Sequence, residues 1–276
     1  MTARLEAYCR RVGLDHPPAP DAGGLAKLQA AHRQSITFEN IDVLLGREIA
    51  IDSDAVFDKL VTRGRGGYCF EQNRLYADML AEIGIATRPL LARPRLAIPE
   101  GTVPPRTHVL LLAEIEGAPW IADAGFGGSF VAPLPLVDGA TTRSADGADH
   151  RLRRIDRPDG EWLLERRGSR AHTDGRATDD PDWQGQYSFD LAPVMPADLM
   201  QANHWTANWP QSRFRETAIV SLVLPEGFVS LTGTQLRHGG ETRSIAGAAE
   251  WREVMQRHFG LALSPDEVAR LPMFAI

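Results

Sequence analysis

The spacing of apolar residues predicts that the first third of the chain is helical. Two amphipathic faces lie behind residue types that cap helices: Leu5, Tyr8 and Val12 after Thr2, and Leu25 and Leu28 after Asp21. A third, short helix is expected to begin at Asp52 or Ser53 and to run into a glycine-rich stretch at 64–67. Behind it comes a fourth helical face, made of Tyr76, Met79, Leu80 and Ile83, with Gly84 as its stop.

From residue 86 the helical period gives way to short apolar or alternating runs. Turns rich in Gly, Pro and Asp separate these runs, which cover 87–93, 107–115, 119–126, 150–155, 161–168 and 186–191. The pattern is typical of a β-barrel or a β-sandwich. The polar stretch 141–150 is predicted to be a loop between two strands.

The last third of the chain mixes the two periods. Strands are expected over 217–225 and 228–236, and a helical face of Trp251, Val254, Met255 and Phe259 follows them. The pattern therefore predicts an α+β, multi-domain protein with three consecutive parts. They are helices over 1–85, strands over 86–192 and a small α/β region over 193–276.

Composition narrows the classes of function. The chain has 276 residues, of which 43% are hydrophobic and 24% charged, enough for one large core or a few smaller ones. A formal net charge of -6 argues against nucleic-acid binding, so a small-molecule partner is expected. We see no signal peptide or membrane-spanning stretch. With two cysteines, no disulfide framework and no zinc-finger spacing, we expect a cytoplasmic protein without a metal.

The stretch RGRGGYCFEQN at 63–73 places three glycines in front of Cys69. A free thiol with a pKa of about 8.5 is mostly protonated at neutral pH, so a nucleophilic cysteine needs its anion stabilised. Unpaired N–H groups at a helix start do this, and glycines let that backbone approach closely. A buried cysteine that only packs would fit the same position, as we expect for Cys9.

Among the eight histidines, His108 is the candidate partner for Cys69. It heads the apolar run 107–115, where a strand would hold its ring rigidly, although a purely structural role fits that place as well. His204 is ambiguous. Of the others, His16 falls in a Pro-rich breaker, and His32 and His258 fall on helices. The polar loops hold His150, His172 and His238.

Asp123 lies in the next apolar run, where an unpaired carboxylate would be costly to bury. If 116–117 is a two-residue turn, Ile115 opposes Ala118, and Asp123 becomes a diagonal neighbour of His108 on the same face. A turn of odd length would send Asp123 to the other face. The alternative role for this residue is a turn carboxylate that backbone N–H groups satisfy.

Seven stretches of the chain resemble the arylamine N-acetyltransferases: 35–46, 57–73, 107–112, 120–128, 187–193, 203–214 and 228–234. The resemblance spans nearly the whole chain. It implies an N-terminal helical bundle, a central β-barrel, a C-terminal α/β lid and a cysteine-protease-like Cys-His-Asp triad. In that triad Cys69 is the acetyl-accepting nucleophile, His108 its base and Asp123 the acid that orients the base.

The resemblance also implies contacts with both substrates. By matching position, Phe38 and Phe126 wall the acceptor pocket, Gly127 and Thr107 are further substrate-binding candidates, and Trp205 lies near coenzyme A. Each of these residues has an alternative role in the core, in a turn or in a strand.

The chain departs from the family pattern at two places. Thr37 stands where the family often has proline, and Ala-Asn-Trp at 207–209 differs from a common Ser-Thr-His pattern. These departures affect the shape of the acceptor site and the contact with the coenzyme. Beneath the glycine stretch, Arg65 is expected to meet a carboxylate such as Glu39.

The implied function is acetyl transfer from acetyl-coenzyme A to the nitrogen of arylamines or arylhydrazines. The expected route is ping-pong, through an acetyl-cysteine thioester on Cys69. An amide synthase acting on a carrier-bound acyl chain, or a transglutaminase-like or papain-like cysteine hydrolase, would use the same three residue types. A catalytically inactive binding module is the alternative from another class. The physiological amine, a xenobiotic or biosynthetic role, and the oligomeric state are left open.

Overall fold

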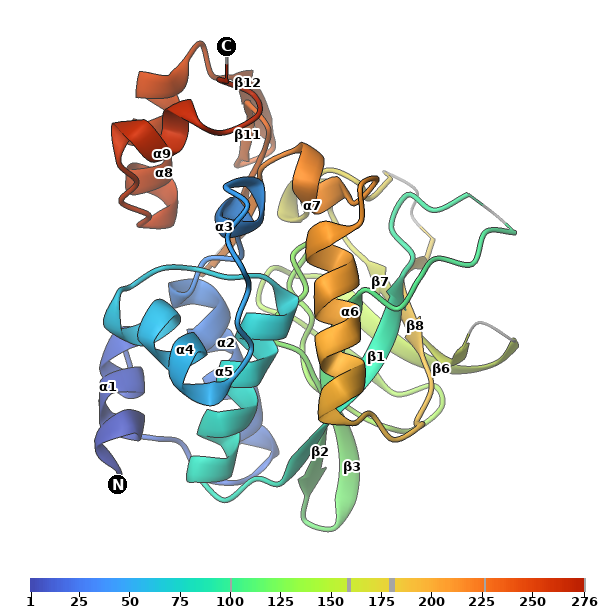
Figure 1. The fold of residues 1–276 in the computed structure, drawn as a ribbon. Helices are drawn as coiled ribbons and strands as arrows, with labels where there is room; N and C mark the ends of the chain where they lie inside the picture. The colour runs from blue at the N-terminus through green and yellow to red at the C-terminus, as the bar shows by residue number, and fades with distance from the viewer. Residues whose placement is uncertain (100, 158–159, 179–181, 226, 276) are drawn as a thin grey trace.

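The computed structural model describes residues 1–99, 101–157, 160–178, 182–225 and 227–275. The N-terminal helices gather to one side of a large sheet, and the last two helices lie together near the C-terminus (Figure 1). Within the described ranges, no helix combines the length and the apolar character needed to cross a membrane.

The predicted N-terminal helices are present and begin at their predicted caps. The helical elements of this part are α1 (Ala3–Arg11), α2 (Ala22–Ser35), α3 (Ile41–Leu44), α4 (Ser53–Phe57), the π-helical turn η1 (Asp58–Thr62) and α5 (Cys69–Glu82). The side chains of Thr2, Asp21 and Asp52 each accept a hydrogen bond from a first-turn N–H group. The apolar faces of α1, α2 and α5 meet in one core, in which Cys9 packs.

Eight antiparallel strands form one sheet in the order β4-β3-β2-β1-β8-β7-β6-β5. The strands are β1 (Thr87–Pro94), β2 (His108–Ile115), β3 (Ala118–Ala122), β4 (Leu134–Pro135), β5 (Thr141–Arg143), β6 (Asp149–Arg157), β7 (Gly160–Arg167) and β8 (Gln184–Phe189). The segment 136–140 alone joins the edge strands β4 and β5, so the two edges lie close and the sheet is nearly closed and barrel-like. Buried apolar side chains fill its interior, among them Leu90, Leu110, Ile121, Leu152, Leu164 and Phe189.

The last third of the chain contributes a smaller sheet and further helices. The four-stranded sheet has the order β12-β11-β10-β9, and the short helix η2 (Arg170–His172) precedes β8. The other elements are α6 (Pro196–Asn208), α7 (Arg213–Glu216), β9 (Ile219–Leu224), β10 (Gly227–Thr232), β11 (Gln235–His238), β12 (Glu241–Ser244), α8 (Ala248–Phe259) and α9 (Pro265–Ala269).

Several local expectations were wrong. Strand β3 ends at Ala122 instead of running to 126, because the chain leaves the ladder at a glycine-containing segment. Part of the stretch expected to be a loop, 141–143, pairs with β6, since backbone pairing at a sheet edge tolerates polar side chains. The run 228–236 is two strands, because the chain reverses at Gly233, whose φ is 59°.

The placement of three histidines in polar loops was also wrong, because each lies in a strand or a short helix. His172 lies in the short helix η2 and His238 in β11. His150 lies in β6 with no exposed surface, and its Nε2 is 3.0 Å from the carbonyl oxygen of Phe130. Burial lowers the pKa of His150 to about 4, so the ring is neutral and structural at neutral pH.

Packing crosses the boundaries expected at residues 85/86 and 192/193. Helix α5 ends at Glu82 and β8 at Phe189, so both boundaries fall between elements. Nevertheless, apolar residues of β2 pack in the core of the N-terminal helices. Likewise, Ile41 and Leu45 pack with Trp251 and Leu271 from the C-terminal part.

Candidate active site

A tight hairpin sets the register of β2 against β3. Its turn is Glu116–Gly117, with φ of 52° and 77°, the combination that a two-residue type I′ hairpin turn requires. Ile115 therefore pairs with Ala118, as the sequence predicted, and Leu111 pairs with Ala122.

The hairpin brings the side chains of His108 and Asp123 together. Asp123 follows the last residue of β3, and its Oδ2 accepts a hydrogen bond from His108 Nε2 at 2.7 Å. The expected contact is therefore present. Continued past Ala122, the register of this hairpin would place Gly125 opposite His108. Gly125 lies beyond β3, however, and the ladder partner of His108 is Ala92 of β1.

The Asp123 carboxylate is buried but fully supplied with donors. Its Oδ1 accepts hydrogen bonds from Asn73 Nδ2 at 3.0 Å and from the Gly125 backbone N–H at 2.8 Å. Burial by itself raises the pKa of Asp123, but the charge of His108 and these hydrogen bonds hold it below the ordinary value. The carboxylate therefore stays ionised beside His108.

His108 is held as a cation by its neighbours. Burial by itself lowers the pKa of this imidazole, but the charge and hydrogen bond of Asp123, together with a hydrogen bond to Cys69, raise it to about 10. Because Nε2 donates to Asp123, Nδ1 is the nitrogen left to face the thiol. The rings of Phe126 and Tyr187, at centroid distances of 5.3 and 5.0 Å, fix the imidazole in place.

Cys69 is the first residue of α5, as the glycine-rich stretch predicted. Its Sγ lies 3.7 Å from the carbonyl oxygen of Thr107, next to His108 in the chain. A Cβ at residue 125 would come within 2.8 Å of Cys69 Cα, so only glycine lets the segment after Asp123 approach Cys69 this closely. The start of a helix and the His108–Asp123 pair thus meet at one sulfur atom.

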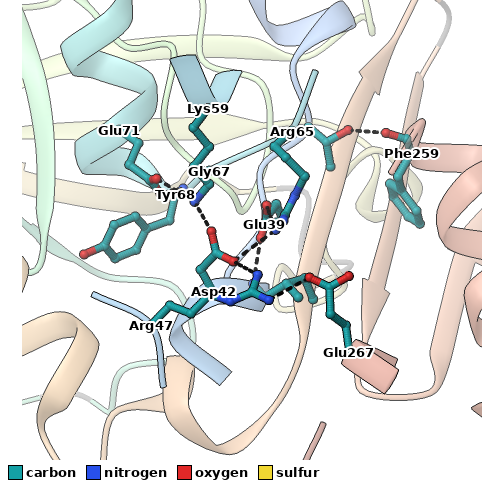
Figure 2. Close-up of polar contacts among 12 residues, drawn as sticks. Glu39, Asp42, Arg47, Lys59, Arg65, Gly67, Tyr68, Glu71, Phe259 and Glu267 are labelled. Carbon is teal, nitrogen blue, oxygen red and sulfur yellow. Dashed lines mark hydrogen bonds and ion pairs between the residues drawn. The ribbon is translucent and has the colours of Figure 1, made fainter. Parts of the chain in front are cut away.

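A buried group of charged side chains fixes the start of α5, where Cys69 lies. Lys59 Nζ lies 2.7 Å from Asp42 Oδ2 and 2.6 Å from Glu71 Oε1, and Glu71 Oε2 accepts the Tyr68 N–H at 3.0 Å (Figure 2). This last bond caps the first turn of α5. The expected pair of Arg65 with Glu39 is also present, at 2.9 Å.

The same group reaches the C-terminal part of the chain. Arg47 bridges Asp42 and Glu267 at 2.8 and 2.7 Å, and Thr37 Oγ1 donates to the carbonyl oxygen of Phe259 at 2.7 Å (Figure 2). The segment 37–47 therefore contacts both α8 and α9.

Sequence reasoning missed two polar side chains on α5 that organise the site. Gln72 Nε2 donates to the carbonyl oxygens of Thr37 at 2.8 Å and Gly67 at 3.1 Å. Asn73 joins Asp123 as described, and its Oδ1 accepts the Ala124 N–H at 2.9 Å. The signal was available: a Glu-Gln-Asn run at the start of a core helix needs buried partners.

A cavity of about 470 Å³ opens onto the thiol. Its lining includes every predicted site residue except Asp123, which lies behind His108: Phe38, Cys69, Thr107, His108, Phe126, Gly127 and Trp205. A Cβ at Gly127 would lie 2.6 Å from Phe38 Cε1, so this glycine lets the Phe38 ring lie against it. The volume and the mainly apolar wall suit a small aromatic molecule.

Two stacked indoles lie at the edge of this cavity. The rings of Trp205 and Trp209 are 4.2 Å apart and 12° from parallel, and each residue is 40% exposed. The sequence pointed to Trp205 alone, because helix α6, which presents it, was not predicted. Within the described ranges, no three His, Cys, Asp or Glu side chains gather in a way that would hold a metal ion.

Comparison with known proteins defines the class and then the family. A family model described as N-acetyltransferase matches residues 21–268. The arylamine N-acetyltransferase of Escherichia coli (strain K12) is 37% identical over 95% of this chain and 90% of its own length. The chain therefore belongs to the arylamine N-acetyltransferase family.

Solved structures agree with this assignment. The arylamine N-acetyltransferase of Salmonella typhimurium matches with a TM-score of 0.89 and 35% identity, covering 100% of both chains. The Mycobacterium marinum arylamine N-acetyltransferase, solved in complex with CoA, matches with a TM-score of 0.84 and 30% identity over 99% of this chain and 100% of that one. The expected mixed architecture with a barrel-like sheet is confirmed.

Proposed function

We propose that this protein transfers an acetyl group from acetyl-coenzyme A to the nitrogen of an arylamine or an arylhydrazine. One observation carries the proposal: a helix-borne cysteine and a histidine–aspartate pair meet at a cavity walled by Phe38 and Phe126. Membership of the family, and the CoA complex of the Mycobacterium marinum relative, support the choice of donor and acceptor.

Cys69, His108 and Asp123 have distinct roles in this reaction. The Cys69 thiolate attacks the acetyl carbonyl carbon, and the C–S bond to coenzyme A breaks as His108 gives its proton to the departing sulfur. The amine then attacks the acetyl-Cys69 carbonyl, His108 takes the amine proton, and Cys69 leaves as a thiolate. Asp123 keeps Nε2 protonated and stabilises the imidazolium.

A cysteine suits this two-step exchange better than a serine. One thioester is replaced by another of similar energy, so the acetyl group stays activated towards the amine. Aromatic amines are largely unprotonated at neutral pH, so the acceptor attacks without prior deprotonation. His108 is needed only as the amide forms.

The substrate contacts belong to the same proposal. Phe38, Phe126, Gly127 and Thr107 would bind the aromatic acceptor, and Trp205 would lie near the coenzyme, since all five line the cavity. The domain boundaries at 85 and 192 and the cytoplasmic location stay predictions.

The test is the intact mass of the protein after mixing with acetyl-coenzyme A in the absence of amine. We expect one acetyl group, mapped to Cys69, which disappears as acetylated arylamine forms after addition of a simple arylamine. Cys69→Ala should not be acetylated and should have no activity. A Cys69→Ala protein that still carried the acetyl group would reject the proposed route. Acylation only by a carrier-bound donor would point to the amide synthase.

A further inference from the structure

Two arginines line the same cavity as the thiol. Arg176 lies in the segment after η2, and Arg213 is the first residue of α7. No acidic side chain lines this cavity in the part of the chain that the structure describes. The wall of this cavity therefore carries positive charge from two separate segments.

A single buried carboxylate positions both guanidinium groups. Asp174 Oδ2 lies 2.6 Å from Arg176 Nε and 3.8 Å from Arg213 Nη1. The Asp174 side chain is 1% exposed, and its backbone N–H donates to the carbonyl oxygen of Gly128 at 2.9 Å. The pair is thus anchored to the segment that also carries Phe126.

The charges in this group do not balance. Two guanidinium groups share one carboxylate, and at 3.8 Å the contact of Arg213 is longer than a hydrogen bond. No other ion pair of Arg213 is found among the described residues. Burial lowers the pKa of Arg213, and the charge of Arg176 lowers it further. A second anion in the cavity would therefore be stabilised by two partly buried cations.

The neighbours of Arg176 indicate which substrate supplies that anion. A Cβ built at Gly128 would lie 3.1 Å from Phe126 Cε1 and 3.2 Å from Arg176 Nη2, so the guanidinium lies beside the Phe126 ring. We propose that Arg176 and Arg213 bind a carboxylate on the aromatic acceptor, so that the preferred acceptors are aromatic amines bearing an acidic group. This inference rests on the proposed function, because it assigns the acceptor class of the same site.

The test compares two acceptors that differ in charge, 4-aminobenzoate and the neutral 4-aminobenzamide. The quantity measured is the ratio of their kcat/KM values, in which common effects on Cys69 cancel. Arg213→Gln and Arg176→Gln should each lower this ratio by about tenfold to a hundredfold, as expected for the loss of a charge-assisted hydrogen bond. Arg213→Lys should lower this ratio less, because a lysine keeps the positive charge but lacks the planar guanidinium group.

Arg215→Gln is the matched control. Arg215 lies on the same short helix and is exposed, donating to the carbonyl oxygen of Asn208, and it does not line the cavity. Its substitution should keep the wild-type ratio. Thermal unfolding and acetylation of Cys69 by acetyl-coenzyme A check that each variant is folded.

The other outcomes overturn the inference in distinguishable ways. An unchanged ratio in both glutamine variants would mean that the arginines do not bind the acceptor carboxylate. A fall in kcat/KM for acetyl-coenzyme A with an unchanged ratio would assign the arginines to the coenzyme phosphates. A wild-type protein that acetylates neither amine would overturn the proposed function together with this subsite.

Discussion

Asp123 determines how His108 titrates. The imidazole is enclosed by apolar rings, and burial alone would keep it neutral, yet the carboxylate at 2.7 Å raises its pKa to about 10. The imidazolium form of His108 is therefore preserved across the physiological pH range.

This coupling predicts a pH dependence of stability. The folded-state pKa of His108 lies above its unfolded value of about 6.5, so the stabilisation is complete below about pH 6.5 and is lost as the pH rises towards 10. Asp123→Asn removes the cause of the raised pKa. We expect the gap in free energy of unfolding between wild type and Asp123→Asn to be a few kcal/mol at pH 6.5 and to shrink towards pH 10.

Urea unfolding at intervals between pH 6 and 10 measures that gap. Asp58→Asn is a suitable control, because Asp58 pairs with Arg63 on the surface, where both side chains are more than half exposed. Its gap to wild type should not vary over this range. A gap for Asp123→Asn that stayed constant from pH 6.5 to 10 would contradict the coupling.

Residues with a local signature could be predicted from the sequence. Cys69 follows glycines at a helix start, His108 heads an apolar run, and Asp123 interrupts the next run. Arg176 and Arg213 have no such signature, because both lie in polar stretches typical of the protein surface. Their approach to one cavity depends on how the barrel meets α7, which local pattern does not encode.

At the scale of elements, the first turn of α5 depends on charges that lie outside that helix. Lys59 of η1 joins Asp42 of α3 to Glu71 of α5, and Glu71 in turn caps Tyr68. Burial by itself lowers the pKa of Lys59, but the carboxylates of Glu71, Glu39 and Asp42 raise it above its ordinary value. The amine therefore remains charged and joins α3, η1 and the first turn of α5, where Cys69 lies.

Removing this amine should be costly. Lys59→Met leaves two buried carboxylates without their shared cation, so the free energy of unfolding should fall by about 3–5 kcal/mol. Arg63→Met, next to η1, breaks only the exposed pair with Asp58. This substitution should change the free energy of unfolding by less than about 1 kcal/mol. Denaturant unfolding of wild type and both variants measures these changes in the free energy of unfolding. Equal, small losses would mean that the buried group contributes nothing beyond a surface pair.

Elements were predicted where the apolar period was strong and missed where it was weak. The large apolar side chains of helix α6 include Met200 and Trp205 on its exposed side, so no single apolar face was evident. Its start was marked nonetheless, by Pro196 at the first position and by Asp198, which accepts the Met195 N–H at 2.8 Å. Strand β5 is polar throughout and exists because its backbone pairs with β6. Capping chemistry, read without the apolar period, would have found α6 but not β5.

In the whole molecule, the three consecutive parts of the chain do not have separate cores. Ile41 and Leu45 complete the C-terminal cluster around Trp251, and Leu111 and Ile115 of the sheet complete the cluster around the N-terminal helices. The charged group that bridges Arg47 to Glu267 adds a polar connection. Such shared burial favours one cooperative unfolding transition over three.

Cooperativity can be tested by perturbing one end of the molecule and observing the other. Leu271 is fully buried in the C-terminal cluster, so Leu271→Ala should cost about 2–5 kcal/mol. Cys9 is buried among the N-terminal helices, and in a Cys69→Ala background it is the remaining thiol. We expect Leu271→Ala to shift the urea midpoint of Cys9 labelling by the same amount as the midpoint seen by far-UV circular dichroism. If Cys9 labelling kept its original midpoint, the C-terminal part would unfold separately. The contacts of Thr37 with α8 and of Arg47 with α9 would then not couple the unfolding of the two ends of the chain.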